Sequence, residues 1–263
     1  VDVGTREHPT CTSCHDPHAA GAPTTGNLPT ALAGVPGIRA DGTAIDEITT
    51  ESELCYSCHG DNPVATSAAI TRLVFQPNVR LDFGPSNPSF HPVESIGVNP
   101  DVPSLRPPWT AGDTMTCGDC HNSPNASRFG GNGPDGPHGS PFSPILARRY
   151  DTHDPNPESA GAYALCYHCH DRDSILNDES FSEHDEHVRN EDAPCSVCHD
   201  PHGVAAGSAS VSDHTHLINF DLSVVSPDPA TGRLEFIDLG AFQGQCFLRC
   251  HGENHSPESY GRD

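Results

Sequence analysis

The chain of 263 residues has no lysine, so all thirteen of its basic side chains are arginines, and it has one methionine and one tryptophan. Only 34% of its residues are apolar, against about 45–50% in ordinary globular proteins. No apolar run reaches the roughly 18 residues that a membrane-spanning helix needs. The net charge of −23 disfavours binding to the phosphates of a nucleic acid. We therefore expect neither a membrane span nor a nucleic-acid partner.

Long regular elements are also scarce. The 24 glycines and 26 prolines interrupt helices and strands throughout the chain. We predict a fold that is mostly coil with short α-helices and a small β-hairpin. The helices are expected at residues 51–59, 160–170 and 176–188, and the hairpin between residues 217–225 and 232–239.

The cysteines form the clearest pattern in the sequence. There are twelve, and they fall into six close pairs: Cys11/Cys14, Cys55/Cys58, Cys117/Cys120, Cys166/Cys169, Cys195/Cys198 and Cys246/Cys250. Two residues separate the cysteines in the first five pairs, and three residues separate them in the last. A histidine follows every pair: His15, His59, His121, His170, His199 and His251.

C-x-x-C-H is the attachment motif of c-type haem. The two thiols form thioethers with the porphyrin, and the adjacent histidine is the proximal ligand of the iron. Histidine accounts for 18 of 263 residues, so six such neighbours would arise by chance with a probability on the order of 10⁻⁷. Zinc sites or short-loop disulfides would leave the repeated Cys-His dipeptide unexplained. The sequence therefore predicts six covalently bound c-type haems.

The motifs extend over the whole chain, which leaves no room for a haem-free domain. We expect a single hexahaem domain at residues 1–263, with internal motif pairs at roughly residues 1–90, 91–180 and 181–263. Six apolar macrocycles would replace the missing side-chain core, with the chain wrapped around a row of haems. Without haem the chain is then expected to be largely unfolded, as small metal-dependent domains are.

The second axial ligand of each iron determines what the haem can do. Met115 lies two residues before Cys117, too close to reach over its own haem. Because histidines are abundant, bis-histidine ligation of every haem is the economical interpretation, with neutral imidazoles oriented by hydrogen bonds. The candidate distal ligands are His18, His202, His91, His138, His187, His216 and His8. His18 and His202 lie three residues beyond a proximal histidine, a spacing that lets each imidazole reach an adjacent haem.

The other histidines fit this role less well. His168 lies between two cysteines and is expected to face away from its iron, and the rest occur in acidic or flexible segments typical of a surface: His153, His184, His214 and His255. Arginines are suited to the bidentate recognition of haem propionates. Arg148, Arg149 and Arg249 are candidates for that contact.

The motifs also carry a resemblance. The segments H-P-T-C-T-S-C-H-D-P-H at residues 8–18 and C-S-V-C-H-D-P-H-G at residues 195–203, the latter followed by H-L-I-N-F, resemble the doubled-CxxCH multihaem cytochromes of metal-reducing bacteria and related archaea. The similarity extends over nearly the whole chain. It implies bis-histidine haems in alternating parallel and T-shaped pairs within a fold of little regular structure. The chain departs from the pattern at C-F-L-R-C-H, residues 246–251, where the extra residue should bulge the loop without preventing attachment.

Some of these relatives assemble into extracellular filaments in which a histidine of one subunit ligates a haem of the next. The resemblance thus implies an electron-transfer protein rather than an enzyme, with other copies of itself, redox proteins or extracellular acceptors as partners. His8 and His18 would be placed to reach a neighbouring subunit, although ligation within one subunit is the alternative. Haem attachment of this kind follows export, so we expect a removed secretory peptide before Val1 and an extracellular or cell-surface location.

Two other functions stay open. A discrete periplasmic electron shuttle would have the same motifs without polymerising. A multihaem reductase would need one haem with an open axial position, often marked by a lysine in place of a proximal histidine. The chain has no lysine, and all six motifs end in histidine, which favours the electron conductor.

Overall fold

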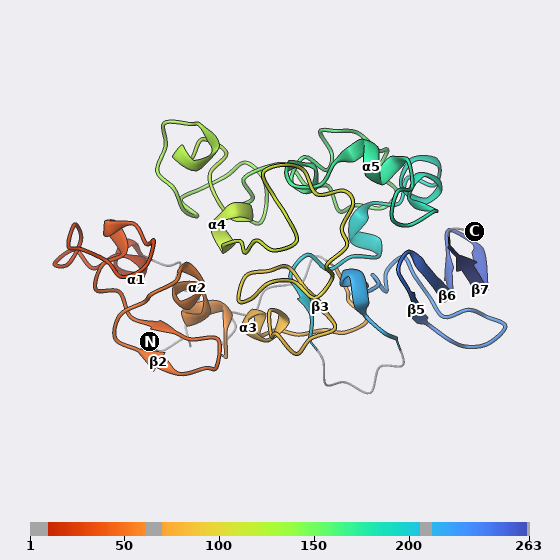
Figure 1. Cartoon of the computed structure of the whole chain (residues 1–263), viewed down its shortest axis with the longest axis horizontal. Helices are drawn as coiled ribbons and strands as arrows, with labels where there is room; N and C mark the ends of the chain where they lie inside the picture. The colour runs from red at the N-terminus through yellow and green to blue at the C-terminus, as the bar shows by residue number, and fades with distance from the viewer. Residues whose placement is uncertain (1–9, 62–69, 206–211, 262–263) are drawn as a thin grey trace.

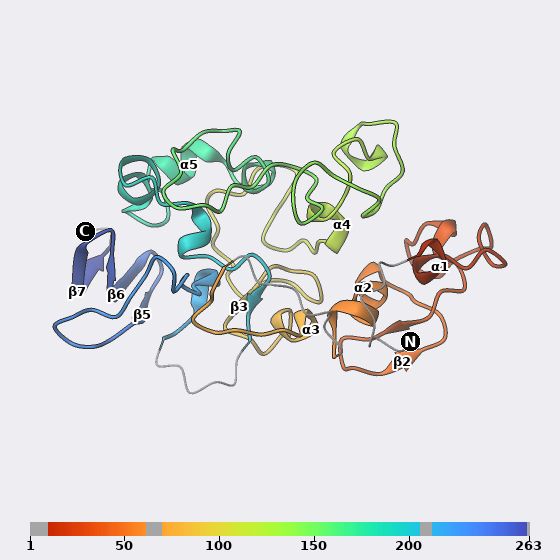
Figure 2. The ribbon, with the colours of Figure 1, turned by 180° about the vertical axis from the view of Figure 1, so that it is seen from behind.

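The computed structural model describes residues 10–61, 70–205 and 212–261. The chain is elongated, with α1 (Cys11–Cys14) at one end of its long axis and β7 (Glu253–Tyr260) at the other (Figure 1). The view from behind shows the same order, with the first motifs and the C-terminal sheet separated by the middle of the chain (Figure 2). The two ends of the chain therefore lie at opposite ends of the molecule, while the middle doubles back, with α4 (Cys117–Cys120) nearer the α1 end than β3 (Ser89–Phe90) is (Figure 1).

The helices are short. The α-helices in the described residues are α1, α2 (Glu51–His59), α3 (Val79–Asp82), α4 (Cys117–Cys120) and α5 (Arg172–Leu176). Single 3₁₀ or π turns occur at Thr30–Leu32, Ser127–Phe129, Cys166–His168, Glu186–Asn190, Cys195–Val197 and Thr215–Leu217.

The strands form three small antiparallel sheets. In the first, β1 (Gly37–Ile38) pairs with β2 (Ala44–Ile45), and in the second β3 (Ser89–Phe90) pairs with β4 (Gly203–Val204). The third contains β5 (Glu235–Gly240), β6 (Gln243–Cys250) and β7 in that order. The prediction of a mostly coil chain with short helices is confirmed.

Of the predicted helices, only residues 51–59 are confirmed, as α2. Residues 160–170 form consecutive turns with a 3₁₀ helix at Cys166–His168, because His170 is drawn into a β-bridge with Leu105. Residues 176–188 are not one helix either. Asp178 has a φ of 57°, a left-handed conformation that stops α5 just after its last residue.

The predicted hairpin has a different partner. Residues 232–239 largely form β5, but β5 pairs with β6 instead of residues 217–225. The latter segment closes around the fifth cysteine motif, where the Asn219 amide donates to the Cys198 carbonyl and the Asp221 amide to the Val197 carbonyl. Backbone amides of this segment are therefore hydrogen-bonded to the cysteine motif instead of to β5.

Buried apolar side chains gather in three small clusters rather than one core. The first surrounds Tyr163 and Tyr167, the second surrounds Phe220 and Phe236 against the C-terminal sheet, and the third surrounds Tyr56. Each cluster lies beside one or more cysteine motifs. None of the helices in the described ranges is both long and apolar enough to cross a bilayer.

Candidate functional site

The six cysteine motifs adopt two backbone geometries. Five lie on a helical turn: α1, α2, α4 and the 3₁₀ turns at Cys166–His168 and Cys195–Val197. Two intervening residues put both thiols on one side of such a turn. The sixth pair lies on strand β6, where three intervening residues put both thiols on the same face. Motif spacing and backbone geometry agree in both cases.

Local sequence explains where three of these turns begin. The residues before α1, α2 and α4 are Thr10, Thr50 and Thr116, and each helix has a capping box with the residue three positions later. The reciprocal hydrogen bonds satisfy amides at the helix start. The cysteine pair is thereby held on a defined first turn.

Consecutive motifs lie next to one another. The Cys117 thiol is hydrogen-bonded to Cys55, and the Cys166 thiol to Cys195. The other consecutive motifs also bring thiols close together. Burial is the main cause that raises the pKa of Cys14, Cys120 and Cys198, and a thiol of the next motif raises each pKa further: Cys58 beside Cys14, Cys169 beside Cys120, and Cys246 and Cys250 beside Cys198. The motifs therefore form a row in sequence order, from the first to the sixth.

Histidine rings face one another in five pairs. The ring centroids are 6.0–6.5 Å apart in the pairs His15–His138, His121–His202, His91–His170, His184–His199 and His187–His255. A metal–nitrogen bond of about 2 Å on each side of one ion would place two opposed imidazole centroids about 6 Å apart. These pairs therefore have the spacing that one six-coordinate iron would require of its two axial ligands.

Four of the five pairs contain a histidine that directly follows a cysteine pair, and the second member comes from elsewhere in the chain. His202 faces His121 rather than His199 of its own motif, as its spacing predicts. The interplanar angles run from 3° for His15–His138 to 61° for His91–His170. All are compatible with two rings that rotate about a shared axis.

Hydrogen bonds orient most of these rings. Nδ1 donates to a backbone carbonyl in His15 (Ala31, 2.8 Å), His121 (Pro144, 3.1 Å), His199 (His216, 2.9 Å), His187 (Glu183, 2.7 Å) and His91 (Pro201). His170 Nδ1 contacts the Ser104 hydroxyl at 2.9 Å. A proton on Nδ1 leaves the Nε2 lone pair free, which is the arrangement that supports a metal-bound imidazole.

Burial favours the neutral form of several of the paired rings. Burial lowers the pKa of His170, His199 and His202 to about 4, and that of His184 to about 3. Burial also lowers the pKa of His91 and His121. A neutral imidazole is the form that binds a metal.

Several predicted ligands are not in such pairs. His216 lies 3.5 Å from the Asp238 carboxylate and contacts the Asn99 amide, and His251 lies against Asp154. Among the described residues, neither His18 nor His59 faces another imidazole ring. His8 lies outside the described residues. The second and sixth motifs thus differ from the other four.

Sequence reasoning missed two histidines. His184 and His255, expected on the surface, each face another histidine. The signal for His184 was its spacing of three residues from His187, which places both on one side of a helical turn. His214 was also expected on the surface but is buried, and it donates to the Ile218 carbonyl. His153 is exposed, as expected.

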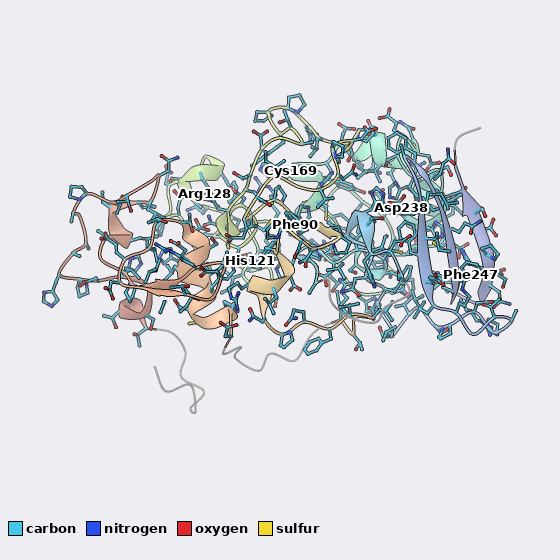
Figure 3. All side chains as sticks on the ribbon, turned by 60° about the horizontal axis from the view of Figure 1, so that its bottom comes forward. Phe90, His121, Arg128, Cys169, Asp238 and Phe247 are labelled. Atoms are coloured by element: carbon cyan, nitrogen blue, oxygen red, sulfur yellow. The ribbon has the colours of Figure 1, made fainter. Side chains whose placement is uncertain are left out.

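The arginines provide a further test of whether a haem fits. Arg148 Nη1 is buried and has no hydrogen-bond partner among the described residues, while its guanidinium stacks 4.4 Å from the Phe129 ring centroid. It lies near the thiols of Cys120 and Cys169, the latter labelled in Figure 3. An unpartnered buried guanidinium beside a cysteine motif suits a haem propionate. Arg149 instead pairs with Asp151.

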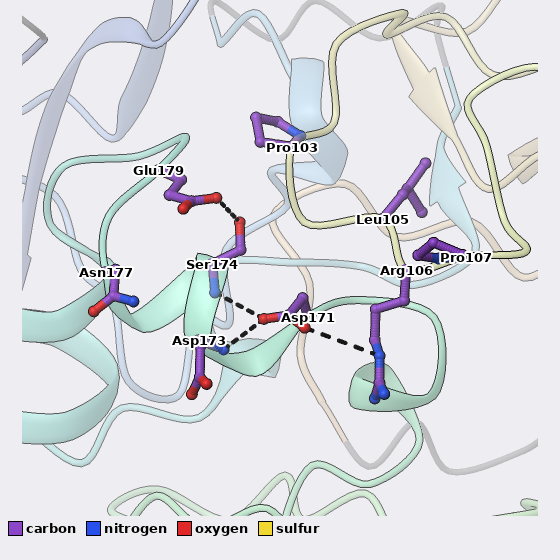
Figure 4. A pocket seen from close by; sticks show the side chains of 9 residues that line it. All are labelled: Pro103, Leu105, Arg106, Pro107, Asp171, Asp173, Ser174, Asn177 and Glu179. Carbon is purple, nitrogen blue, oxygen red and sulfur yellow. Dashed lines mark hydrogen bonds and ion pairs between the residues drawn. The ribbon is translucent and has the colours of Figure 1, made fainter.

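A hollow lies beside the fourth motif, where the segment Pro103–Pro107 runs past the start of α5 (Figure 4). Asp171 caps α5 through the amides of Asp173 and Ser174 and also pairs with Arg106. The Arg106 amide and guanidinium bind the carbonyls of Cys169 and Tyr167. The hollow is mainly polar, and the hydrogen bonds at its rim hold the His170 motif in place.

Histidines in the described ranges oppose one another in twos, and no group of three or more metal-ligating side chains converges there. No known protein family, curated protein or solved structure matches this chain. Any assignment of function therefore depends on the motifs and the geometry of the chain itself.

Proposed function

We propose that the chain is a hexahaem c-type cytochrome that conducts electrons along a row of bis-histidine haems. The observation that carries this proposal is the coincidence of two independent patterns. Four of the six histidines that follow a cysteine pair also face a second imidazole at 6.0–6.5 Å. A covalent haem needs both the thiols and the imidazole pair, and no alternative use of the cysteines needs both.

When bound, the haems supply the redox chemistry. The protein's residues fix their spacing and their ligands. The cysteine pairs would hold the haems in sequence order, the Nδ1 hydrogen bonds of rings such as His15 and His199 set the direction of those imidazoles, and burial keeps rings such as His199 neutral. Where two histidines would ligate the same haem, no position would remain for a substrate, which suits electron transfer rather than catalysis.

We further propose that the chain is exported and is a subunit of an extracellular filament. The first and last motifs lie at opposite ends of an elongated molecule, so head-to-tail contacts between copies would be heterologous and would propagate as a fibre. His59 lacks an opposed imidazole in the described residues, and His8 or His18 of this chain or of a neighbouring copy would supply it. Electron microscopy of native material would show fibres if this is correct, and only discrete particles if the protein is a shuttle.

Coordination can be tested by electron paramagnetic resonance of the oxidised protein and carbon monoxide titration of the reduced protein. The assembled protein should be entirely low-spin and should not bind carbon monoxide. If a neighbouring subunit ligates the second haem, dissociation into monomers should convert one haem in six to a high-spin form. If all six stay low-spin in monomers, that ligand comes from within the chain.

His59 is also the observation that favours the alternative function, a multihaem reductase. A haem with an open ligand position would likewise have a motif histidine with no opposed imidazole among the described residues. The titration separates the two functions. A reductase would bind one equivalent of carbon monoxide per chain in the assembled state as well as in monomers. A conductor would not bind it in the assembled state.

A further inference from the structure

The sixth cysteine motif is built on a strand, and the strand determines which side chains accompany its thiols. Cys246, Leu248 and Cys250 alternate along β6 and therefore share one face. That face packs against the cluster containing Phe220 and Phe236. The thiols thus point toward the interior of the molecule.

The register of β7 adds a histidine to this face. His255 is paired with Leu248, while Glu258 is paired with Cys246 and Glu253 with Cys250. Directly paired residues project on the same side of a sheet. The His255 imidazole therefore stands on the cysteine face, midway between the two thiols along the strand. An iron held beneath a porphyrin that is anchored at both cysteines needs a ligand in that position.

A second imidazole lies opposite. The His187 ring centroid is 6.1 Å from that of His255, which matches the spacing of the four pairs that contain a motif histidine. His187 Nδ1 donates to the Glu183 carbonyl at 2.7 Å, so its Nε2 is free. Phe181 stacks on His187 and packs against Tyr260 at the far end of β7. Aromatic rings therefore flank the gap between the two imidazoles.

The histidine of the motif itself is engaged elsewhere. His251 has a φ of 49° at the turn between β6 and β7, and its Nε2 lies 3.0 Å from both carboxylate oxygens of Asp154. Its Nδ1 lies 3.7 Å from a Glu191 carboxylate oxygen. Both ring nitrogens thus face acidic groups from two other segments, and neither faces an imidazole of the residues that the structure describes.

We propose that the haem attached to Cys246 and Cys250 is ligated by His255 and His187, and that His251 is a positioning residue that anchors the hairpin. This inference rests on the proposed function, since it assigns ligands to one of the six haems. It also accounts for the extra residue in the motif. On a strand, two thiols share a face at a spacing of four positions and the next residue, His251, points away from that face, so an adjacent strand must supply the ligand.

The test compares His255→Ala and His187→Ala with His251→Asn, which keeps a polar side chain opposite Asp154. Each alanine variant should convert one haem in six to a high-spin form that binds one equivalent of carbon monoxide, and added imidazole should restore the low-spin signal. His251→Asn should keep every haem that is low-spin in the unmodified protein. His255→Met should raise the potential of one haem, because methionine ligation does so.

The assignment is overturned if His255→Ala and His255→Met leave the spin states and potentials unchanged. It is equally overturned if the unmodified chain carries five haems and Cys246 and Cys250 react with iodoacetamide. Both results would leave electron transfer by the other haems intact. Failure of the proposed function itself would look different, because the unmodified chain would then contain no covalent haem.

Discussion

At the residue scale, the paired imidazoles combine a fixed direction with a suppressed charge. The carbonyl that receives Nδ1–H from His15 or His199 selects the tautomer, and burial keeps the His199 ring neutral. The partner ring needs only to be at the correct distance. Losing one partner should therefore expose a single coordination position while the other haems keep their ligands.

Replacing His138 by alanine tests this directly. His138 faces His15 with an interplanar angle of 3°, so His138→Ala should leave one haem in six high-spin and able to bind carbon monoxide. His153→Ala is the matched control, because His153 is exposed and its ring contacts the Pro155 carbonyl of its own loop. Electron paramagnetic resonance of both variants provides the measurement. A fully low-spin His138→Ala protein would contradict the pairing.

Glu158 supports the fourth motif without touching a proposed ligand. Its carboxylate accepts hydrogen bonds from Arg172 at 2.5 and 2.9 Å and from the Tyr167 hydroxyl at 2.9 Å. Glu158→Gln should lower the free energy of unfolding by about 1–3 kcal/mol, because the Arg172 guanidinium and the Tyr167 hydroxyl would lose their charged hydrogen-bond acceptor. Asp173→Asn is the control. The Asp173 side chain is 84% exposed and its carboxylate lies 3.8 Å from the same arginine, a long surface contact worth about 0–1 kcal/mol.

The same carboxylate makes stability depend on pH. The Arg172 hydrogen bond lowers the pKa of Glu158 below its ordinary value of 4.5. Its stabilising effect is therefore complete above pH 4.5 and is lost as the pH falls through the lowered pKa. Denaturation followed between pH 6 and pH 2, a range of about four units around that value, should show an acid-dependent loss that Glu158→Gln reduces. Identical profiles for the two proteins would contradict this role.

The sequence predicts the cysteine motifs because their spacing is local, but it predicts the facing histidines only in part. His138 and His91 reach their partners through coil, where no periodicity indicates a direction. His184 and His255 have acidic neighbours that indicate a surface position, yet each faces another histidine. The apolar sequence neighbours of His216 favour a ligand role, yet Asp238, distant in sequence, lies beside its ring. Tertiary contacts decide these cases.

At the element scale, one arginine joins the turns that carry the second and third motifs. Arg128, labelled in Figure 3, contacts Glu51 of α2 at 3.5 Å, Asp119 of α4 at 3.2 Å and Asp135 at 3.8 Å. Glu51 also accepts a hydrogen bond from the Gly118 amide. Without the guanidinium, three carboxylates would face one another with no compensating charge.

Arg128→Gln should therefore lower the unfolding free energy of the holoprotein by about 1–3 kcal/mol. Arg149→Gln removes the same charge from an exposed pair with Asp151 and should cost less than about 1 kcal/mol. Thermal unfolding of the two variants under identical conditions makes the comparison. Equal losses would show that Arg128 does not connect the two turns.

Helix α2 was predictable because Thr50 and Glu53 form a capping box that is visible in the sequence. The other two predicted helices do not form. In the first of them the backbone around His170 is instead hydrogen-bonded to a distant segment, in its bridge to Leu105. The hairpin partner of β5 could not be predicted because β6 contains the cysteine pair. From the sequence alone, its C-x₃-C spacing is equally compatible with a helical turn, and only the strand pairing shows that it lies on a strand.

At the scale of the whole molecule, the described residues have three small apolar clusters, so the proposed haems would have to supply most of the stabilising burial. Chain produced without haem attachment should therefore be unfolded, as with metal-dependent domains. Small-angle scattering should give a radius of gyration near 57 Å, as expected for about 263 unfolded residues, against about 18 Å for a compact domain of this length. A compact haem-free chain with cooperative unfolding would contradict this account.

The central claim is that all twelve cysteines bind haem. Intact mass spectrometry of the native protein, after treatment with iodoacetamide under denaturing conditions, tests it most directly. The account predicts the mass of the chain plus six haems, with no cysteine alkylated. A mass that lacks haem, with the thiols alkylated or joined as disulfides, would contradict it.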